Sequence, residues 1–302
     1  MSDTLEKRDL TGLGLMDHLS SSESYFEQQT RTLDQPLSAL DEERIKTSVA
    51  ALNSEVSLSE ILRPKIWQVE EFNHTNAPVI LGVLQDKKGF SVPHGYRVLD
   101  MPIRIPGQGW RLTEECAPFE EAIMKAVEHE KLMNPDFDDY YCYVTIDQKV
   151  VEPSVSQRRA GWHTDAFITD DTGIQLDVIP ENLAASGYKN GEPAERTYIV
   201  ADEFPTQFVN GPFNLSGISA HDHDGIAETF DSMAQDREAY VFPAYTLLRL
   251  DPYVVHTAVP SDKPEPTPRS FIKIAFSRYK YNRQGNSKNP HFDYNWPSTP
   301  IA

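Results

Sequence analysis

The chain has 302 residues, of which 39% are hydrophobic and 25% charged, as in a globular protein with one large domain or two small ones. Its formal net charge of −18 argues against duplex DNA or RNA as a substrate, because an acidic surface repels phosphate groups. No apolar run approaches the roughly 20 residues that cross a membrane, and Met1 to Leu15 lacks a signal-peptide core. We therefore expect a cytoplasmic protein without a membrane segment.

The first 60 residues are polar and acidic, and we expect an arm that is helical or partly disordered, with a helix over 40–53. The pattern changes after this arm, and residues 61–302 are predicted to form one domain. Short apolar segments with β-branched residues predict strands over 79–84 and 96–105.

One clear helix is predicted over 117–133. Pro118 suits a first helical turn. Phe119, Ile123 and Val127 form an apolar stripe at helical spacing, and the Asn-Pro pair at 134–135 ends the helix.

The rest of the chain is rich in predicted strands, over 140–146, 197–200, 240–242, 246–250, 253–259 and 270–279. Turns rich in Pro, Gly, Asp and Asn separate them, which favours a sandwich or barrel, and a jelly roll is one such fold. We expect a mainly β fold with helical support. An insertion is predicted near 205–238, with a helix that places Ile226, Phe230 and Met233 on one side.

Two residues in the sequence Gly-Trp-His-Thr-Asp suggest a metal site. His163 and Asp165 are two positions apart, so on a strand their side chains point to the same face. His256, in a second β-rich stretch, is the best candidate for a third ligand. Two histidines and one carboxylate leave open positions on a metal, which is the ligand set of non-haem Fe(II) oxygenases.

Arg269 follows His256 by 13 residues (269 − 256) and lies at the start of a predicted strand. A guanidinium near the metal can bind a carboxylate through two hydrogen bonds. Lys273 lies on the same strand face and is a substitute for this role.

The His-x-Asp motif, the distant His256 and the following Arg269 together resemble the Fe(II)/2-oxoglutarate-dependent dioxygenases, over roughly residues 140–280. The resemblance implies a double-stranded β-helix, a jelly roll that cupins also share. It implies that His163, Asp165 and His256 hold catalytic Fe(II), that 2-oxoglutarate chelates the iron, and that Arg269 binds its far carboxylate. Reaction with O2 would yield succinate, CO2 and an oxidised substrate.

Two departures from the family pattern are visible. The gap from His163 to His256 is 93 residues (256 − 163), which is longer than in many members, and Phe271 stands where many members have Ser or Thr. Asp165 keeps the carboxylate that halogenating relatives lack, so the resemblance implies hydroxylation, desaturation or cyclisation.

Further candidates for ligand contact lie near these motifs. We expect Tyr143 to help bind the cosubstrate, and Trp162, Phe167 and Tyr141 to line the substrate pocket. Either Arg158 or Arg159 is a candidate for binding a substrate carboxylate. The cluster His221-Asp222-His223-Asp224 is interpreted as a solvated loop or part of a lid, and Cys116 and Cys142 as buried thiols.

The predicted function is oxidation, above all hydroxylation, of a small molecule such as an amino acid or a specialised metabolite. One alternative is a cupin-like metal-binding protein or isomerase that does not use 2-oxoglutarate. Another is a protein hydroxylase, because open grooves for protein substrates leave no mark in the sequence.

Overall fold

The computed structural model describes residues 72–73, 76–91, 95–134, 136–158, 161–165, 196–218, 222–278, 280–281 and 284–296. The arm predicted for residues 1–60 and its helix over 40–53 lie outside these ranges. In the described part of the chain, every helix is too short or too polar to cross a lipid bilayer.

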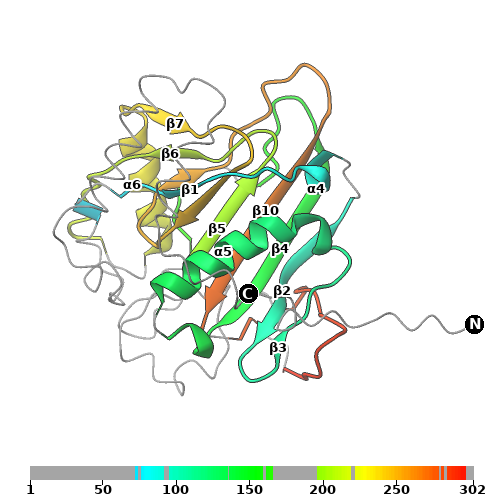
Figure 1. Ribbon diagram of the computed structural model, residues 1–302. Coiled ribbons are helices and arrows are strands. Elements are labelled where there is room, and N and C mark those ends of the chain that lie inside the picture. Colours follow the sequence, from blue (N-terminus) through cyan, green and yellow to red (C-terminus); the bar gives the residue numbers. More distant parts are fainter. Residues whose placement is uncertain are drawn as a thin grey trace, which may run out of the picture.

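Two antiparallel sheets form the body of the molecule (Figure 1). The large sheet has 7 strands, in the spatial order β1 (Val79–Val83), β8 (Thr246–Leu250), β5 (Arg196–Ala201), β10 (Thr267–Ser277), β4 (Tyr141–Val151), β2 (Arg97–Ile105) and β3 (Gly109–Trp110). The small sheet has 3 strands, in the order β7 (Ala239–Val241), β6 (Gln207–Val209) and β9 (His256–Thr257). The helices are α4 (Lys88–Ser91), α5 (Glu120–Met133) and α6 (His223–Ala234), with short 3-10 turns η3 (Ala117–Phe119) and η4 (Phe137–Asp139).

The strand order is that of a jelly roll. A bridge between His163 and His256 adds the segment around His163 to the small sheet, beside β9. From β4 onward, the chain then visits the two sheets in turn: large, small (His163), large (β5), small (β6 and β7), large (β8), small (β9) and large (β10). This alternation winds the two sheets together and confirms the predicted double-stranded β-helix.

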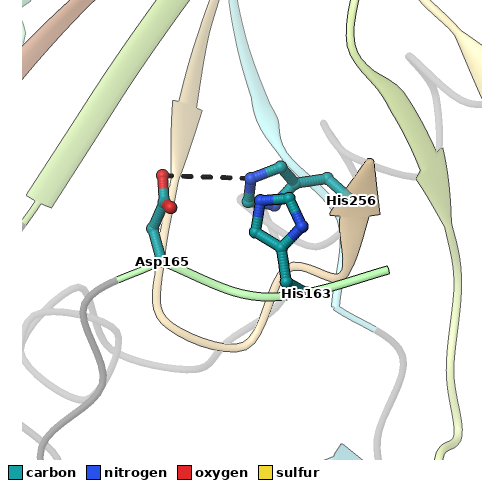
Figure 2. Close-up of side chains that lie close together, drawn as sticks. All are labelled: His163, Asp165 and His256. Atoms are coloured by element: carbon teal, nitrogen blue, oxygen red, sulfur yellow. Dashed lines mark ion pairs between the residues drawn. The ribbon is translucent and has the colours of Figure 1, made fainter. Parts of the chain in front are cut away.

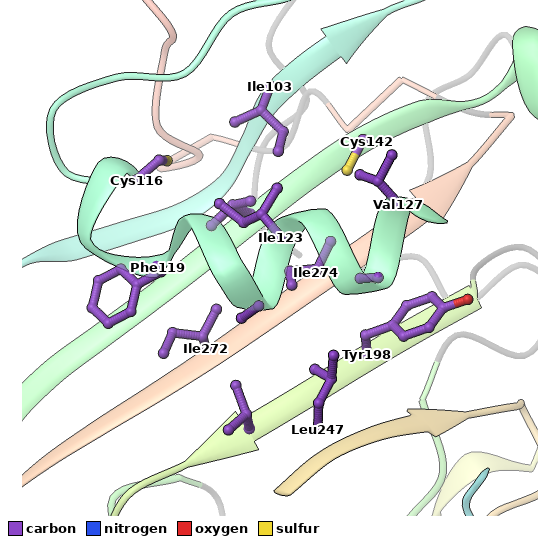
Figure 3. Close-up of a cluster of buried hydrophobic side chains, with 14 of the residues drawn as sticks. Ile103, Cys116, Phe119, Ile123, Val127, Cys142, Tyr198, Leu247, Ile272 and Ile274 are labelled. Atoms are coloured by element: carbon purple, nitrogen blue, oxygen red, sulfur yellow. The ribbon is translucent and has the colours of Figure 1, made fainter. Parts of the chain in front are cut away.

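Helix α5 covers the outer face of the large sheet, as the sequence predicts (Figure 3). Pro118 lies in the 3-10 turn that leads into it, and Asn134 caps its end. Phe119, Ile123 and Val127 pack onto outward-facing residues of the sheet, among them Ile272 and Ile274 of β10. Complete burial of a side chain such as Ile123 stabilises the fold by about 2 kcal/mol. Cys116 and Cys142 are free and buried in this cluster, as predicted.

A second cluster fills the space between the two sheets. Ile199, Leu248 and Phe271 of the large sheet pack there with Phe208 and Tyr240 of the small sheet. Because side chains alternate along a strand, the side of β10 that carries Phe271 also carries Arg269 and Lys273. The inner face of β10 therefore combines apolar packing with two cations.

Helix α6 lies beside the small sheet and buries its own apolar face (Figure 1). Ile226 and Phe230 are buried and Met233 is partly buried, in a third cluster with Phe72 and Tyr253. The predicted helix and its apolar side are confirmed. Asp222 caps its first turn by accepting a hydrogen bond from the Gly225 amide at 2.9 Å.

Several predicted strand limits need correction. The strand expected over 253–259 shrinks to β9, because Asp251 accepts a hydrogen bond from the Tyr253 amide and turns the chain before it. Strand β4 extends five residues beyond the predicted end at 146, because β10 pairs with it as far as Val151. The insertion expected near 205–238 includes β6, which is the middle strand of the small sheet and not an addition to it.

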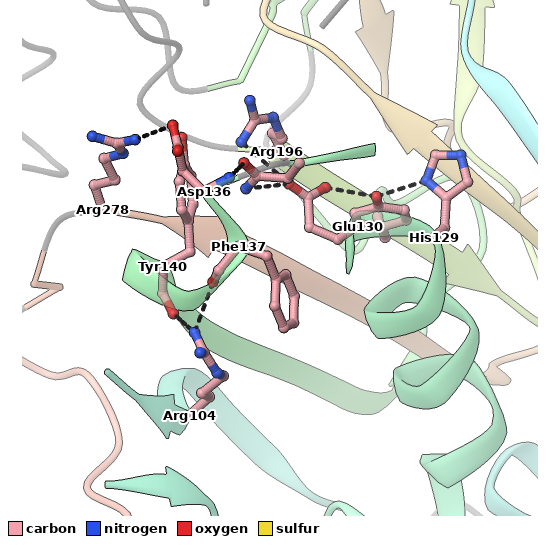
Figure 4. Close-up of polar contacts among 10 residues, drawn as sticks. Arg104, His129, Glu130, Asp136, Phe137, Tyr140, Arg196 and Arg278 are labelled. Carbon is pink, nitrogen blue, oxygen red and sulfur yellow. Dashed lines mark hydrogen bonds and ion pairs between the residues drawn. The ribbon is translucent and has the colours of Figure 1, made fainter. Parts of the chain in front are cut away.

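A buried polar network fixes the C-terminal end of α5 to the large sheet (Figure 4). The Glu130 carboxylate lies 3.2 Å from the Arg196 guanidinium and accepts a hydrogen bond from the Tyr198 hydroxyl at 2.8 Å. His129 Nδ1 lies 2.9 Å from the same hydroxyl oxygen. Since that hydroxyl donates its proton to Glu130, His129 Nδ1 must be the donor in the second bond. Burial lowers the pKa of His129 to about 4, so the ring is neutral at pH 7.

Candidate metal centre

The structure brings His163, Asp165 and His256 together at one end of the space between the sheets (Figure 2). Each offers one ligand atom, and these atoms lie within 4.8 Å of one another. His256 Nε2 is 3.9 Å from an Asp165 carboxylate oxygen, and the two imidazole ring centres are 4.6 Å apart. Among the described residues, this group has the composition and spacing for a metal ion.

The hydrogen bonds of the two rings prepare them as ligands. His163 Nδ1 lies 2.8 Å from the carbonyl oxygen of Gly161, and His256 Nδ1 lies 2.9 Å from that of Val254. A carbonyl oxygen can only accept, so both Nδ1 atoms carry the proton. In the neutral rings Nε2 then keeps its lone pair, and a backbone carbonyl fixes each ring as in known metal sites. The three side chains therefore fit a divalent metal ion.

The local backbone explains why these side chains converge. Gly161 has a φ of +99°, which side-chain-bearing residues rarely adopt, and this turn aims its carbonyl at His163. The Trp162 amide donates to Asp231 of α6 at 2.8 Å, which ties the turn to that helix. On the other side, His256 pairs with Phe208 of β6.

The electrostatics of the site favour the deprotonated, metal-binding forms. Burial lowers the pKa of His256 to about 4, although the Asp165 carboxylate opposes this effect. Burial alone would raise the pKa of Asp165, but the charges of His256, Lys273, His163 and Arg158 outweigh it and lower the pKa to about 2. At neutral pH the site thus presents a carboxylate and a neutral His256 ring.

Arg269 is enclosed by protein groups. Only 2% of its surface is exposed. Its Nε donates to the carbonyl of Glu203 at 2.6 Å, its Nη2 to that of Phe204 at 2.9 Å, and its Nη1 to the side-chain oxygen of Gln157. Phe204 has a left-handed φ of +46°, so Arg269 fixes a tight turn after β5.

Lys273 and Arg158 bring positive charge to the metal site. Both lower the pKa of Asp165. Lys273 Nζ lies 3.6 Å from the Asp100 carboxylate, and its side chain is 15% exposed. Arg158 is exposed, and its guanidinium lies 5.0 Å from the centre of the Phe271 ring.

The aromatic residues that the sequence suggested for ligand contact have different neighbours in the structure. Tyr141 and Tyr143 share one strand face, as alternation predicts, with ring centres 5.9 Å apart. Tyr143 is buried, stacks on Tyr281 at 4.1 Å, and accepts a hydrogen bond from its amide. Trp162 is partly buried and packs against the apolar cluster of α6. Phe167, Arg159 and His221 lie outside the described residues.

Two residues that support the site could not be identified from the sequence. Asp231 and Asp100 are distant in sequence from the residues they contact, so no local pattern marks them. Gly161 is visible in the same motif as His163, and glycine is the residue that most readily adopts the positive φ found here.

Comparisons with known proteins give weak similarities. No protein-family model and no curated protein matches this chain. Among solved structures, AviO1 from Streptomyces viridochromogenes Tue57 is 14% identical, with 80% of this chain and 86% of that chain covered and a TM-score of 0.30. HygX from Streptomyces hygroscopicus, with nickel and 2-oxoglutarate bound, is 9% identical (80% and 79% covered, TM-score 0.29).

The Kdo hydroxylase KdoO is a non-heme Fe(II) alphaketoglutarate-dependent dioxygenase, solved in complex with cobalt(II). It is 16% identical, with 62% of this chain and 71% of that chain covered and a TM-score of 0.31. The identities and TM-scores of these structures are too low to support a fold assignment. The jelly roll is therefore assigned from the strand order of this chain alone.

Proposed function

We propose that this protein is an Fe(II)- and 2-oxoglutarate-dependent oxygenase that oxidises, and most simply hydroxylates, a small molecule. One observation carries the proposal: two imidazole Nε2 atoms and one carboxylate meet inside a jelly roll, with both Nδ1 atoms held by backbone carbonyls. Three protein ligands on one side of an ion leave positions for a cosubstrate and O2.

The residues of the chain have distinct tasks in this proposal. His163, Asp165 and His256 would hold the ion in a fixed orientation, and the neighbouring sheet would exclude water from one side. When bound, iron supplies activation of O2, which no side chain can provide, and couples decarboxylation of 2-oxoglutarate to succinate with oxidation of a C–H bond. The reaction consumes one O2 and releases CO2, with one oxygen atom going to succinate and the other to the hydroxylated substrate.

The enclosure of Arg269 supports a second candidate, a cupin-like metal protein that does not use 2-oxoglutarate. Three nitrogen atoms of its guanidinium already donate to protein oxygens. A carboxylate would have to use the remaining N–H groups or another cation.

Turnover of 2-oxoglutarate separates the two candidates. Protein loaded anaerobically with Fe(II) is exposed to O2, and succinate is measured with and without a panel of amino acids. The oxygenase proposal expects succinate from wild type and none above background from His163→Ala. Stimulation by one compound would identify the substrate class. If iron binds but 2-oxoglutarate is neither bound nor consumed, the cupin-like candidate replaces the oxygenase.

A further inference from the structure

The carboxylate of Asp231 and the ring of His163 are joined through a single peptide group. The peptide bond between Gly161 and Trp162 is trans, so its N–H and its C=O point in opposite directions. The N–H donates to Asp231 Oδ1 at 2.8 Å. The C=O accepts a hydrogen bond from His163 Nδ1 at 2.8 Å. A continuous chain of hydrogen bonds therefore runs from a carboxylate on α6 to a candidate metal ligand.

This chain of hydrogen bonds acts on both the orientation and the strength of the ligand. A peptide group that is held at both ends keeps the Gly161 carbonyl, and with it the His163 ring, in one orientation. A carboxylate at the N–H end also increases the negative charge on the carbonyl oxygen, because hydrogen bonds in a chain polarise one another. The carbonyl then attracts the Nδ1 proton more strongly, which makes Nε2 a better ligand.

The position of Asp231 in α6 is unfavourable for the helix itself. Asp231 lies in the last turn, where the helix dipole disfavours a negative charge, and that turn contains no basic residue. Aspartate is also a poorer helix former than alanine. Helix stability therefore gives no reason for an aspartate here, whereas the hydrogen bond to the turn before His163 gives one.

Helix α6 supports both segments that carry a histidine ligand. Because side chains alternate along extended backbone, the neighbours of the two histidines point away from the metal site. Trp162 packs against the apolar cluster of α6, and Val255 is 1% exposed within that cluster. Asp231 thus adds one directional contact to apolar packing that already joins α6 to both segments.

We infer that Asp231 is a positioning residue of the metal centre, which acts on His163 through the peptide group between Gly161 and Trp162. The inference rests on the metal centre of the proposed function and is independent of 2-oxoglutarate. It gives α6 a part in metal binding, although the three ligand atoms come from other parts of the chain.

The test measures the affinity of three variants for Fe(II) by calorimetry under anaerobic conditions. Asp231→Ala should bind Fe(II) about 10-fold more weakly than wild type, which is the low end for loss of a group that orients a histidine ligand. The low end applies because Asp231 is exposed. Asp231→Asn keeps an oxygen acceptor without the charge and should lose about threefold, since charged hydrogen bonds are roughly twice as strong as neutral ones. Glu228→Ala removes an exposed charge from the same helix and should bind as wild type does.

Stability and metal binding should separate in these variants. Urea unfolding of the metal-free proteins should give nearly the same midpoint for Asp231→Ala as for wild type, because the better helix former offsets the lost hydrogen bond. A purely structural role for Asp231 would instead lower this midpoint and leave the Fe(II) affinity of the folded protein unchanged.

Hydrogen exchange of the wild-type protein tests the same link without a variant. Coupling is reciprocal, so if the Asp231 contact strengthens Fe(II) binding about 10-fold, bound Fe(II) strengthens that contact by the same factor. Peptides from α6 should then exchange about 10-fold more slowly with Fe(II) bound. Peptides from α5, on the outer face of the large sheet, should change less.

Equal Fe(II) affinity in Asp231→Ala and wild type, or an equal loss in Glu228→Ala, overturns the inference and leaves the oxygenase proposal standing. If Asp231→Ala does not fold, exchange in α6 that is unchanged by Fe(II), or slowed no more than in α5, overturns it instead. If wild type does not bind Fe(II), this inference and the proposed function fail together.

Discussion

The backbones of His163 and His256 are joined by a reciprocal pair of hydrogen bonds. The amide of His163 donates to the carbonyl of His256 at 3.0 Å, and the amide of His256 donates to the carbonyl of His163 at 2.9 Å. Residues 93 positions apart in sequence (256 − 163) thus form one rigid unit. Because each ring is also tied to a carbonyl two residues before it, the site is preorganised for a metal.

Gly161→Ala should weaken metal binding more than its effect on folding explains. A Cβ at a φ of +99° costs about 1–2 kcal/mol, and any relief of this strain moves the carbonyl that holds His163. We expect Fe(II) affinity to fall about 10-fold or more. Gly285→Ala is the matched control, since its φ is +95° with open space around it, and it should leave Fe(II) affinity unchanged. Equal losses in both variants would contradict the role of this turn.

Removal of either histidine ligand should abolish tight binding of iron. His163→Ala and His256→Ala each leave two ligands where three are needed, and equilibrium dialysis under anaerobic conditions should show at least a 100-fold weaker affinity than wild type, on the order of the energy of one metal–ligand bond. His291→Ala, which changes a half-buried histidine in the C-terminal segment, should bind as wild type does. Retained stoichiometric binding in either ligand variant would mean that the ion is held elsewhere.

Arg269→Lys should lower the free energy of unfolding by about 3 kcal/mol, because a lysine cannot reproduce three donors in a fixed fork. The carbonyls of Glu203 and Phe204 would lose their donors beside a left-handed turn. Urea unfolding measures the effect, with Arg97→Lys at an exposed position of β2 as the control, expected to change stability by less than about 0.5 kcal/mol. An unchanged midpoint for Arg269→Lys would contradict the role of Arg269 in fixing this turn.

The stability of the fold should depend on pH through His129. Burial lowers its pKa from 6.5 to about 4, so the unfolded chain takes up a proton in this range and the folded chain does not. The stability that comes from a neutral His129 is fully present above about pH 6.5 and is lost as the pH falls towards 4. This residue should add up to about 1.4 kcal/mol per pH unit to the slope of unfolding free energy against pH.

His129→Asn removes that titration while its amide can still donate to Tyr198. Urea unfolding at several pH values should give a shallower slope for this variant than for wild type between pH 4 and 6.5. Parallel slopes would show that His129 titrates as it does in the unfolded chain.

The sequence predicts the parts of this structure that depend on short-range patterns. The stripe of Phe119, Ile123 and Val127 predicts α5, and the spacing of His163 and Asp165 predicts that they share a face. Long-range pairing carries no local signal, so neither the limits of β9 nor the place of β6 in the small sheet could be predicted.

The contacts of Arg269 likewise depend on residues that are distant in sequence. Spacing along the chain allowed both Arg269 and Lys273 as cations for the cosubstrate. The groups that enclose Arg269 come from residues 65 to 112 positions away, so no local pattern could show how its guanidinium is held.

The position of bound iron is the decisive test of the proposed metal centre. Crystals grown anaerobically with Fe(II) would be measured at the iron absorption edge, and the anomalous map would locate the ion. We predict a peak about 2.0–2.2 Å from Nε2 of His163, Nε2 of His256 and a carboxylate oxygen of Asp165. A peak elsewhere, or iron bound through Nδ1 of either histidine, would contradict it.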